Sequence, residues 1–310
     1  MPIRALPLTT LACVLALAAC KPAPPRTASA ADADAKPAEA KPAAVPAAAD
    51  AKPSGADDNL NAVLWMQRSV EYRATTETVY RAAADKLDLA LKQPNWDALV
   101  PEERGNPAKG LKPAVVMDVD ETVLDNSPYQ ARLVRDGKSF DEFSWSQWCR
   151  EKAAKALPGA LQFARLAAQH GVTVFYLSNR AQDLNEATLD NLRAEGFPLA
   201  TQETVFLGLG TIVDGCEQVG SEKGCRRELV GRKHRVLMQV GDQLGDFVDV
   251  LANTPQGRRD AVAGYTEWFG QRWFVLPNPT YGSWEPALFN NEWSKPEPVR
   301  RSDKISNFRY

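Results

Sequence analysis

The hydrophobic positions of this chain alternate between short continuous runs and amphipathic stretches, and this pattern predicts a sheet flanked by helices. The continuous runs are rich in β-branched and aromatic residues, which is typical of buried parallel strands. The predicted strands are residues 114–118, 172–177, 204–207, 235–240 and 273–276. Helical periodicity predicts one or two helices over 59–93 and further helices over 158–169, 183–195 and 221–229. Because strands and helices alternate, we expect an α/β fold with a Rossmann-like, mostly parallel sheet and a helical N-terminal segment.

One predicted connection is much longer than the others. Residues 125–157 separate the first strand from the helix that returns to the sheet. They are rich in aromatic residues, among them Phe140, Trp145 and Trp148. Long loops in compact domains are commonly lids or binding loops. We therefore expect a small cap or insertion at 125–157, within a folded domain that spans 58–300 and is followed by a tail at 301–310.

The N-terminal residues 1–19 have the pattern of a secretory signal peptide. Arg4 precedes an apolar run that is too short to span a membrane. The run ends in Leu17-Ala18-Ala19-Cys20, which resembles the bacterial lipobox, where cleavage leaves the cysteine as a lipid-modified N-terminus. We expect lipidation of Cys20 with acyl chains such as palmitate. The alternative is ordinary signal cleavage, with Cys20 as an incidental thiol.

The residues after the signal predict both the location and the attachment of the folded domain. Lys21 is not the Asp that retains bacterial lipoproteins in the inner membrane, so we expect an outer-membrane lipoprotein. Residues 20–57 consist mainly of Ala, Pro, Lys and Asp in low-complexity order. Such a segment buries too little apolar surface to fold. It predicts a disordered tether between the lipidated Cys20 and the domain.

The net charge and the cysteine spacing argue against two kinds of function, nucleic-acid binding and metal binding by cysteines. The net charge of −2 gives no sign of nucleic-acid binding, which calls for a strongly basic surface. Three cysteines lie in the predicted domain, namely Cys149, Cys216 and Cys225, and their spacing is not that of a metal site. An exported protein meets an oxidising compartment, where disulfides can form. Two possibilities therefore remain for Cys216 and Cys225: a disulfide between them, or two free thiols.

Paired acids end the first predicted strand. Asp118 and Asp120 are one residue apart, so in an extended segment their side chains point the same way. Two close carboxylates repel each other unless a cation or a shared proton lies between them. The pair indicates either a magnesium-assisted site, with one Asp as nucleophile, or an acidic turn after a strand.

Two further strands also end in polar residues. Ser178 follows the strand at 172–177, and Asp242 and Asp246 follow the strand at 235–240. Carboxyl ends of parallel strands share one edge of a sheet, so we expect these groups to converge with Asp118 and Asp120. A site whose ligands are all oxygen atoms favours Mg²⁺. The convergence shifts the interpretation toward a magnesium site.

Other hydrolytic and nucleotide-binding motifs are absent from the sequence. The chain has 2 histidines, His170 and His234, and no Arg-His-Gly, so neither a histidine phosphatase nor a zinc hydrolase is indicated. Gly208-Leu209-Gly210 is too short for a dinucleotide fingerprint. No phosphate-binding loop of the Gly-x-x-x-x-Gly-Lys-Ser/Thr type occurs.

The polar motifs together resemble those of the haloacid dehalogenase (HAD) superfamily of phosphotransferases. The matching features are Asp-x-Asp-x-Thr at 118–122, Ser178, a lysine before the last acidic strand, and Gly-Asp-x-x-x-Asp at 241–246. The lysine candidate is Lys223, which opens the helix before that strand. Lys233 is the competing candidate, but it lies almost on the strand. The resemblance implies a HAD-like fold.

A narrower resemblance is to the class C acid phosphatases, bacterial outer-membrane lipoproteins that act as 5′-nucleotidases and broad phosphomonoesterases. It is carried by Asp118–Tyr129, by Ser178-Asn179-Arg180 and by the segment Leu276–Glu285. It covers residues 58–300. It implies a Mg²⁺-dependent acid phosphatase that forms an aspartyl-phosphate intermediate, acts on small-molecule phosphomonoesters such as nucleoside 5′-monophosphates, and prefers acidic pH.

The resemblance also implies roles for individual residues. Asp118 attacks phosphorus, and Asp120 is general acid and then general base. Ser178 and Lys223 bind the transferring phosphoryl oxygens. The residues implied in metal binding are Asp118, the Asp120 carbonyl, Asp242 and, in support, Asp246.

Substrate contacts and assembly follow from the same resemblance. Aromatic rings are expected to sandwich a nucleobase, with Trp145 and Tyr281 as the candidates. Asn179 and Arg180 either orient their loop or contact the ribose, and for Arg180 a structural turn is favoured. Members of the family are often dimeric, which implies a homodimer. The alternative function is a surface lipoprotein that acts as a binding or adhesin module on an inactive phosphatase fold, although every catalytic position is filled here.

Overall fold

The computed structural model describes residues 58–310. The predicted signal peptide at 1–19, the lipidation site Cys20 and the tether at 20–57 lie outside the described residues. No helix among the described residues combines the length and the apolar character that crossing a membrane requires.

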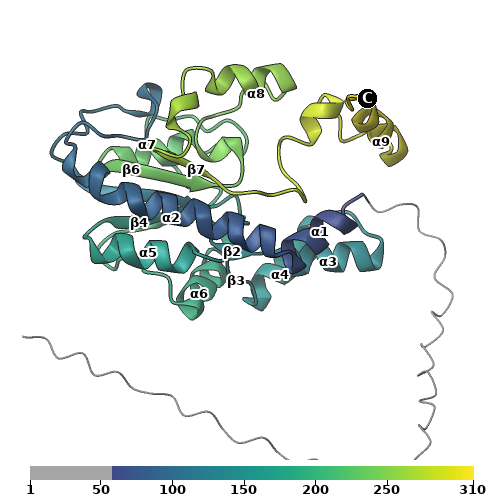
Figure 1. Cartoon of the computed structure of the whole chain (residues 1–310), viewed down its shortest axis with the longest axis horizontal. Coiled ribbons are helices and arrows are strands. Elements are labelled where there is room, and N and C mark those ends of the chain that lie inside the picture. Colours follow the sequence, from purple (N-terminus) through teal and green to yellow (C-terminus); the bar gives the residue numbers. More distant parts are fainter. Residues whose placement is uncertain (1–57) are drawn as a thin grey trace, which may run out of the picture. The chain divides into compact units, whose positions relative to one another are not determined.

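A five-stranded parallel sheet forms the centre of the fold, with strand order β5-β4-β1-β6-β7 (Figure 1). Every neighbouring pair in it is parallel. The strands are β1 (Lys112–Asp118), β4 (Thr173–Leu177), β5 (Phe206–Leu207), β6 (His234–Gly241) and β7 (Trp273–Val275). All five strand predictions and the α/β class are therefore confirmed, and the fold is that expected from the resemblance to the HAD superfamily.

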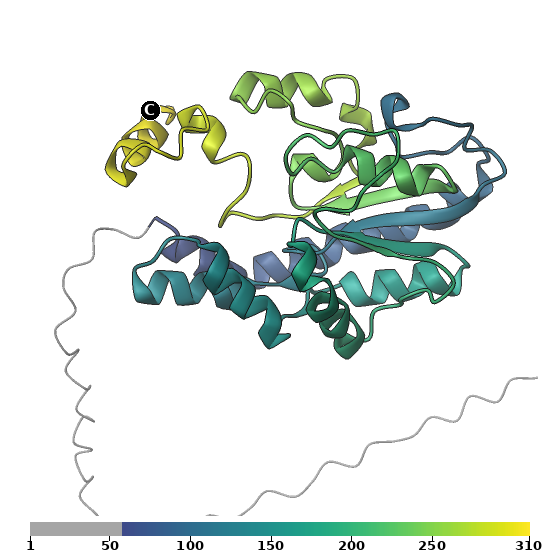
Figure 2. The same cartoon turned by 180° about the vertical axis from the view of Figure 1, so that it is seen from behind.

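Helices cover both faces of this sheet (Figures 1 and 2). The first face packs against α2, α5 and α6, for example through Leu87, Phe163 and Leu192. The second face packs against α7 and α8 through Val230 and Val262. These helices are α2 (Val70–Lys92), α5 (Ala160–Gln169), α6 (Asn185–Glu195), α7 (Gly224–Gly231) and α8 (Pro255–Val262), and α1 (Leu60–Arg68) precedes them.

Alternation along the central strand explains why both faces are apolar. Val115 and Met117 of β1 point into the core on the first face, whereas Ala114 and Val116 point into the core on the second. Successive side chains of a strand point to opposite faces of a sheet. A strand covered on both faces therefore appears in the sequence as an unbroken apolar run, which is the pattern that predicted β1.

The predicted insertion at 125–157 is helical rather than a long loop. It contains α3 (Ser127–Asp136) and α4 (Glu142–Glu151). A two-stranded antiparallel ladder of β2 (Leu124–Asp125) and β3 (Lys155–Ala156) closes its base. The Asp141 carboxylate caps α4 by accepting a hydrogen bond of 2.9 Å from the Ser144 backbone N–H. The insertion is thus an ordered unit that follows β1 along the chain.

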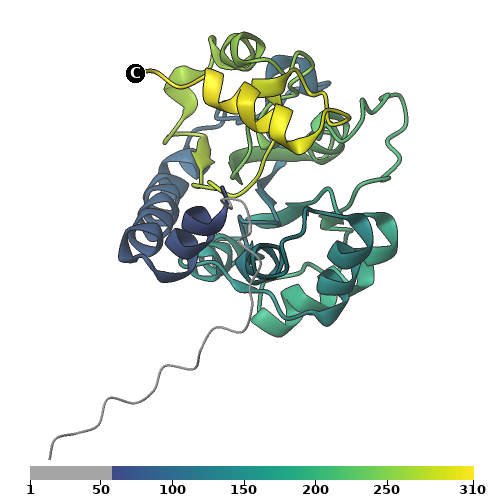
Figure 3. The ribbon, with the colours of Figure 1, turned by 90° about the vertical axis from the view of Figure 1, so that its right-hand side faces the viewer.

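The C-terminal residues form α9 (Glu297–Ser306), so the predicted domain boundary at residue 300 lies inside a helix. Arg301 of α9 forms an ion pair of 3.0 Å with Asp58, which precedes α1. Figure 3 shows α9 and α1 at the same end of the folded part. The remaining short segments are the 3-10 helices η1 (Pro101–Glu103), η2 (Gln182–Leu184), η3 (Leu244–Asp246), η4 (Thr266–Trp268) and η5 (Pro286–Phe289).

Of the two possibilities left open for the cysteines, the structure contains the disulfide between Cys216 and Cys225. Cys149 is a buried free thiol. The bridge closes a loop with a sequence separation of 9, and Lys223 lies inside it. The disulfide therefore restrains the segment that leads into α7.

Reduction of this disulfide is expected to lower the free energy of unfolding by about 2 to 3 kcal/mol, because a loop of this length regains that much chain entropy when the unfolded protein is no longer cross-linked. Urea unfolding of the wild type with and without a reductant measures the difference. The Cys216→Ser/Cys225→Ser variant serves as the control and should not respond to the reductant. Equal unfolding midpoints of the wild type under the two conditions would contradict the expectation.

Candidate active site

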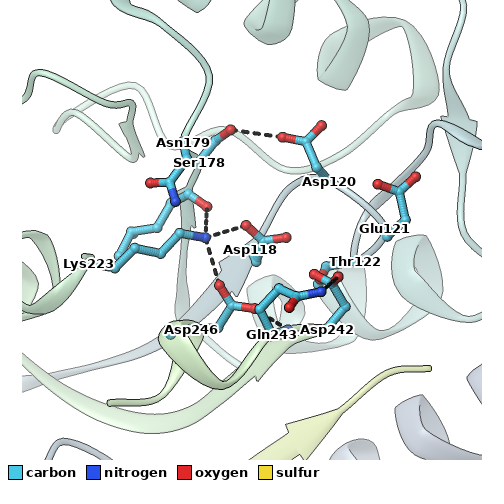
Figure 4. Close-up of polar contacts among 12 residues, drawn as sticks. Asp118, Asp120, Glu121, Thr122, Ser178, Asn179, Lys223, Asp242, Gln243 and Asp246 are labelled. Atoms are coloured by element: carbon cyan, nitrogen blue, oxygen red, sulfur yellow. Dashed lines mark hydrogen bonds and ion pairs between the residues drawn. The ribbon is translucent and has the colours of Figure 1, made fainter. Parts of the chain in front are cut away.

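Polar side chains gather at the carboxyl edge of the sheet (Figure 4). Asp118 is the last residue of β1, Ser178 follows β4, and Asp242 follows β6. Since the three strands are adjacent and parallel, their ends place these residues next to one another. Asp120, Lys223 and Asp246 complete the cluster, so all the predicted catalytic and metal-binding residues lie together.

Lys223 lies at the centre of the cluster. It is the N-cap residue of α7 and is 5% exposed. Its Nζ donates hydrogen bonds to Asp118 Oδ1 and, at 2.7 Å, to Asp246 Oδ1. Burial opposes the charged form, but the attraction of Asp118 and Asp246 raises the pKa of Lys223 above its usual value. The competing candidate, Lys233, is exposed and precedes β6 at the opposite edge of the sheet.

Three carboxyl groups are close enough to share a cation. One carboxylate oxygen from each of Asp118, Asp242 and Asp246 lies within 4.8 Å of the other two. Asp118 Oδ2 is buried and accepts no hydrogen bond. Burial, together with the neighbouring carboxylates, raises the pKa of Asp118 well above its usual value despite Lys223. A buried acceptor without a donor among like charges fits a hard divalent cation, which oxygen ligands favour.

Neighbouring amides fix the orientation of the two acids after β6. Asp242 Oδ2 accepts hydrogen bonds from Gln243 Nε2 at 2.7 Å and from Asn278 Nδ2 at 2.8 Å. Asp246 Oδ2 accepts one from the backbone N–H of Gln243 at 2.8 Å, as part of a capping box on η3. Burial and the nearby Asp246 raise the pKa of Asp242 to about 8. Both carboxylates are therefore held in place by residues outside the cluster.

Asp120 is held by a different set of donors. Its Oδ1 accepts hydrogen bonds from Arg180 Nε at 3.0 Å, Arg180 Nη2 at 2.8 Å and Asn126 Nδ2 at 2.9 Å. Its Oδ2 accepts one from Ser178 Oγ at 3.1 Å. Arg180 is 2% exposed. The sequence favoured a turn residue at this position, whereas the structure has a buried guanidinium that orients the second acid of the motif.

Glu121 is a site residue that the sequence reasoning did not single out. It is fully buried and has a φ of 57°, an unusual backbone conformation for a residue with a side chain. Its carboxylate accepts hydrogen bonds from the Asn126 backbone N–H at 2.7 Å and from the Tyr281 hydroxyl. Burial, followed by the effect of Asp120, raises its pKa to about 8. In the sequence, only its position inside Asp-Val-Asp-Glu-Thr indicates that Glu121 belongs to the site.

The predicted substrate-binding residues border this cluster. The Tyr281 hydroxyl donates a hydrogen bond to the carboxylate of Glu121, which lies next to Asp120 in the chain. Trp145 of α4 is half-buried, with the Arg180 guanidinium 5.4 Å above its ring and Tyr129 packed edge-on against it. Asn179 is exposed, and its Oδ1 accepts a hydrogen bond of 2.6 Å from Arg226. The insertion therefore contacts the site through Trp145, which packs against Arg180, the residue that binds Asp120.

Comparison with protein families gives a match over residues 26–284, which is most of the chain. The matching family model is described as "HAD superfamily, subfamily IIIB (Acid phosphatase)". Among solved structures, the class C acid phosphatase from Bacillus anthracis is similar, with a TM-score of 0.68 and 34% sequence identity. The match covers 81% of this chain and 97% of that protein. A structure of the Bacillus anthracis enzyme with tungstate bound matches with a TM-score of 0.69.

More distant similarity extends to plant proteins. Acid phosphatase 1 from Solanum lycopersicum is 26% identical over 188 residues, which is 59% of this chain and 66% of that protein. Vegetative storage protein 2 from Arabidopsis thaliana is 28% identical over 167 residues, 54% of this chain and 55% of that protein. The chain therefore spans less than two thirds of the length of these two relatives.

Proposed function

The chain belongs to the acid phosphatases of HAD subfamily IIIB, and we propose that it hydrolyses phosphomonoesters through an aspartyl-phosphate intermediate on Asp118. The observation that carries the proposal is the convergence at one sheet edge of Asp118 with Lys223 and two further aspartates. The buried Oδ2 of Asp118, which accepts no hydrogen bond, supports a cation beside this residue.

The metal of the proposed reaction is Mg²⁺. Asp118, Asp242 and Asp246 would hold it with their carboxylates, and the Asp120 carbonyl would be a further ligand, as the family resemblance implies. When bound, the ion offsets the negative charge of the carboxylates and polarises a phosphoryl oxygen. The ligand set contains oxygen atoms alone, which suits this hard cation.

The first step of the proposed mechanism forms the covalent intermediate. A carboxylate oxygen of Asp118 attacks phosphorus, and the bond between phosphorus and the ester oxygen breaks. Asp120 gives a proton to the departing alcohol oxygen. We assign that proton to Oδ2 of Asp120, because Oδ1 already accepts three N–H hydrogen bonds from Arg180 and Asn126.

The second step reverses the roles of Asp120. Its Oδ2 takes a proton from a water molecule, which attacks the same phosphorus atom and releases phosphate and the Asp118 carboxylate. Ser178 Oγ, which donates to this Oδ2 at 3.1 Å, would turn to a phosphoryl oxygen when substrate is bound. Lys223 Nζ would hold a second phosphoryl oxygen. The tungstate described for the Bacillus anthracis enzyme is a tetrahedral oxyanion like phosphate, which supports an oxyanion site in this family.

The proposed substrates are nucleoside 5′-monophosphates. Trp145 and Tyr281 would contact the base or ribose, and Asn179 lies exposed beside Ser178. The support is the position of Trp145 against Arg180 and of Tyr281 against Glu121, both next to the acids of the motif. Comparing kcat/KM for a nucleoside 5′-monophosphate with that for an aryl phosphate tests this preference. A preference for the aryl phosphate would contradict it.

The activity itself has a direct test. Phosphate release from a nucleoside 5′-monophosphate is measured with the purified protein, at acidic and neutral pH, with added Mg²⁺ and with EDTA. The proposal predicts turnover with Mg²⁺ that is lost with EDTA and is highest at acidic pH. Turnover that EDTA leaves unchanged would contradict the magnesium mechanism, and absence of turnover under all conditions would favour the binding-module alternative.

Arg180→Met is expected to lower kcat by roughly 10²-fold, the range typical for loss of a general acid–base contribution. The substitution removes two of the hydrogen bonds that orient Asp120. Steady-state kinetics measures the loss, and Arg132→Met is the matched control, because Arg132 is a half-exposed arginine that pairs with Glu151 and stacks on Trp148 outside the cluster. Equal effects of the two substitutions on kcat would contradict the assigned role of Arg180.

We also propose that the protein is an outer-membrane lipoprotein anchored through Cys20, and that it assembles as a homodimer. The lipobox-like Leu17-Ala18-Ala19-Cys20 supports the anchor, and the family resemblance supports the dimer. Sedimentation analysis of the folded domain tests the assembly, with a monomer as the contradicting result.

The Cys20→Ser variant is expected to move from the membrane fraction to the soluble fraction, because it loses the site of acylation. More than one acyl chain is needed for stable anchoring, so loss of the lipidated residue should release nearly all of the protein. Fractionation of expressing bacteria followed by immunoblotting measures the distribution. A Cys20→Ser protein that stays in the outer-membrane fraction would contradict the anchor.

A further inference from the structure

A buried arginine beside the site connects two separate segments of the chain. Arg226 of α7 is fully buried. Its Nη1 donates to the Ser178 carbonyl at 2.7 Å, and its Nη2 donates to Asn179 Oδ1 at 2.6 Å. The same Nη2 donates to the carbonyls of Ser221 and Glu222 at 3.2 Å each. One guanidinium therefore binds the loop after β4 and the segment before α7 at the same time.

Each of these two segments carries a group of the proposed reaction. The loop after β4 presents the Ser178 hydroxyl, and the segment before α7 presents the Lys223 ammonium group, one residue after Glu222. We propose that Arg226 is a positioning residue that fixes the distance between Ser178 and Lys223, and so sets the oxyanion site to the size of a phosphoryl group. This inference rests on the proposed function of the site.

The hydrogen-bonding geometry requires arginine rather than another cation. A guanidinium presents a rigid, planar set of donors, whereas an ammonium group is a single point on a flexible stem. The acceptors of Arg226 belong to two separate segments, and the most distant of them along the chain is the Ser178 carbonyl, 48 residues from Arg226. Lysine at this position would keep the charge but would not span both segments.

The charge of Arg226 is also unusual for a buried group. No carboxylate of residues 58–310 lies within ion-pair distance of it, whereas Arg227 beside it pairs with Glu103 and Asp249. Burial, together with the adjacent Arg227, lowers the pKa of Arg226 to about 10, so it remains charged at neutral and acidic pH. An unpaired buried cation behind Ser178 favours an anion in front of it.

The test compares Arg226→Met and Arg226→Lys with the wild type. The readouts are binding of inorganic phosphate to the Mg²⁺-loaded protein by calorimetry, kcat and KM for a nucleoside monophosphate, and the thermal unfolding midpoint. We expect both variants to bind phosphate about 10- to 100-fold more weakly and to lose kcat by a similar factor. A loss in kcat beyond any loss of folded protein separates positioning from a structural role.

Arg235→Met is the matched control. Arg235 is a buried arginine at the opposite edge of the sheet that donates to the carbonyls of Ala90, Gln93 and Trp96. Its loss is expected to lower the unfolding midpoint while phosphate affinity and kcat per folded molecule stay unchanged. Phosphate affinity reduced as much in this control as in Arg226→Met would overturn the inference.

A double-mutant cycle with Ser178→Ala makes the test sharper. If Arg226 acts through Ser178, its replacement costs less phosphate affinity in the Ser178→Ala background than in the wild type. Additive losses, unchanged phosphate affinity in the folded Arg226 variants, or failure of both variants to fold would each overturn the inference. Wild-type protein that binds no phosphate would instead contradict the proposed function.

Discussion

Asp118→Asn is expected to abolish phosphate release, with kcat reduced by roughly 10⁴-fold or more, as is typical when a nucleophile is removed. The amide is nearly the same size as the carboxylate but is a poor nucleophile. It also presents a donor where the native oxygens face Lys223 and the metal site. The fold should survive, because the buried Lys223 keeps its ion pair with Asp246.

The measurement is steady-state phosphate release together with a thermal unfolding curve of the same preparation. Asp190→Asn is the control, since Asp190 is a half-exposed aspartate on α6 that pairs with Lys152 and Arg193 outside the cluster. The control should keep wild-type kcat. An Asp118→Asn protein with more than about one tenth of the wild-type activity would contradict the nucleophile assignment, because loss of a nucleophile costs several orders of magnitude.

Asp242→Asn is expected to weaken Mg²⁺ binding by roughly 10- to 100-fold or more, because even residues behind the ligands of a metal site change affinity by that factor. The substitution removes one negative charge from the three-carboxylate cluster. It also places an amide against the amide donors of Gln243 and Asn278. Activity should be low at limiting Mg²⁺ and should recover in part when the Mg²⁺ concentration is raised.

Titration of Mg²⁺ into EDTA-treated protein, followed by the assay of phosphate release, measures the apparent affinity for the metal. Asp260→Asn serves as the control, because Asp260 is an exposed aspartate on α8 that accepts a hydrogen bond from the Gln256 side chain. An unchanged Mg²⁺ dependence in Asp242→Asn would contradict the assigned metal site. Full activity of the wild type after chelation would contradict the need for a metal.

The parallel sheet could be predicted because its strands are covered on both faces. Burial on both faces leaves few polar residues in the interior of a strand, so β1 and β4 appear in the sequence as apolar runs and β6 as an apolar run interrupted by Gln239. The same burial makes the first polar residue after a run mark the edge of the sheet. Asp118, Ser178 and Asp242 were recognised in this way, and their convergence followed from the parallel arrangement alone.

Residues whose roles depend on distant partners could not be recognised in the sequence. Arg180 and Asp120 are 60 residues apart along the chain, and no local pattern links them. The role of Arg226 could not be predicted for the same reason, because its hydrogen-bond acceptors lie on two separate loops. The two-residue strands β2 and β3 are too short to produce a hydrophobic period, and their pairing depends on the closure of the insertion.

In the proposed reaction, the phosphoryl group of the substrate is transferred to Asp118. The most direct measurement is rapid quenching of the wild type with a phosphomonoester and Mg²⁺, followed by borohydride reduction and mass spectrometry of the peptide that contains Asp118. We predict that Asp118 alone is converted to the reduced, homoserine-containing product, and that the conversion requires both substrate and Mg²⁺. Continued turnover of the substrate with Asp118 unmodified, or with modification at Asp120 instead, would contradict it.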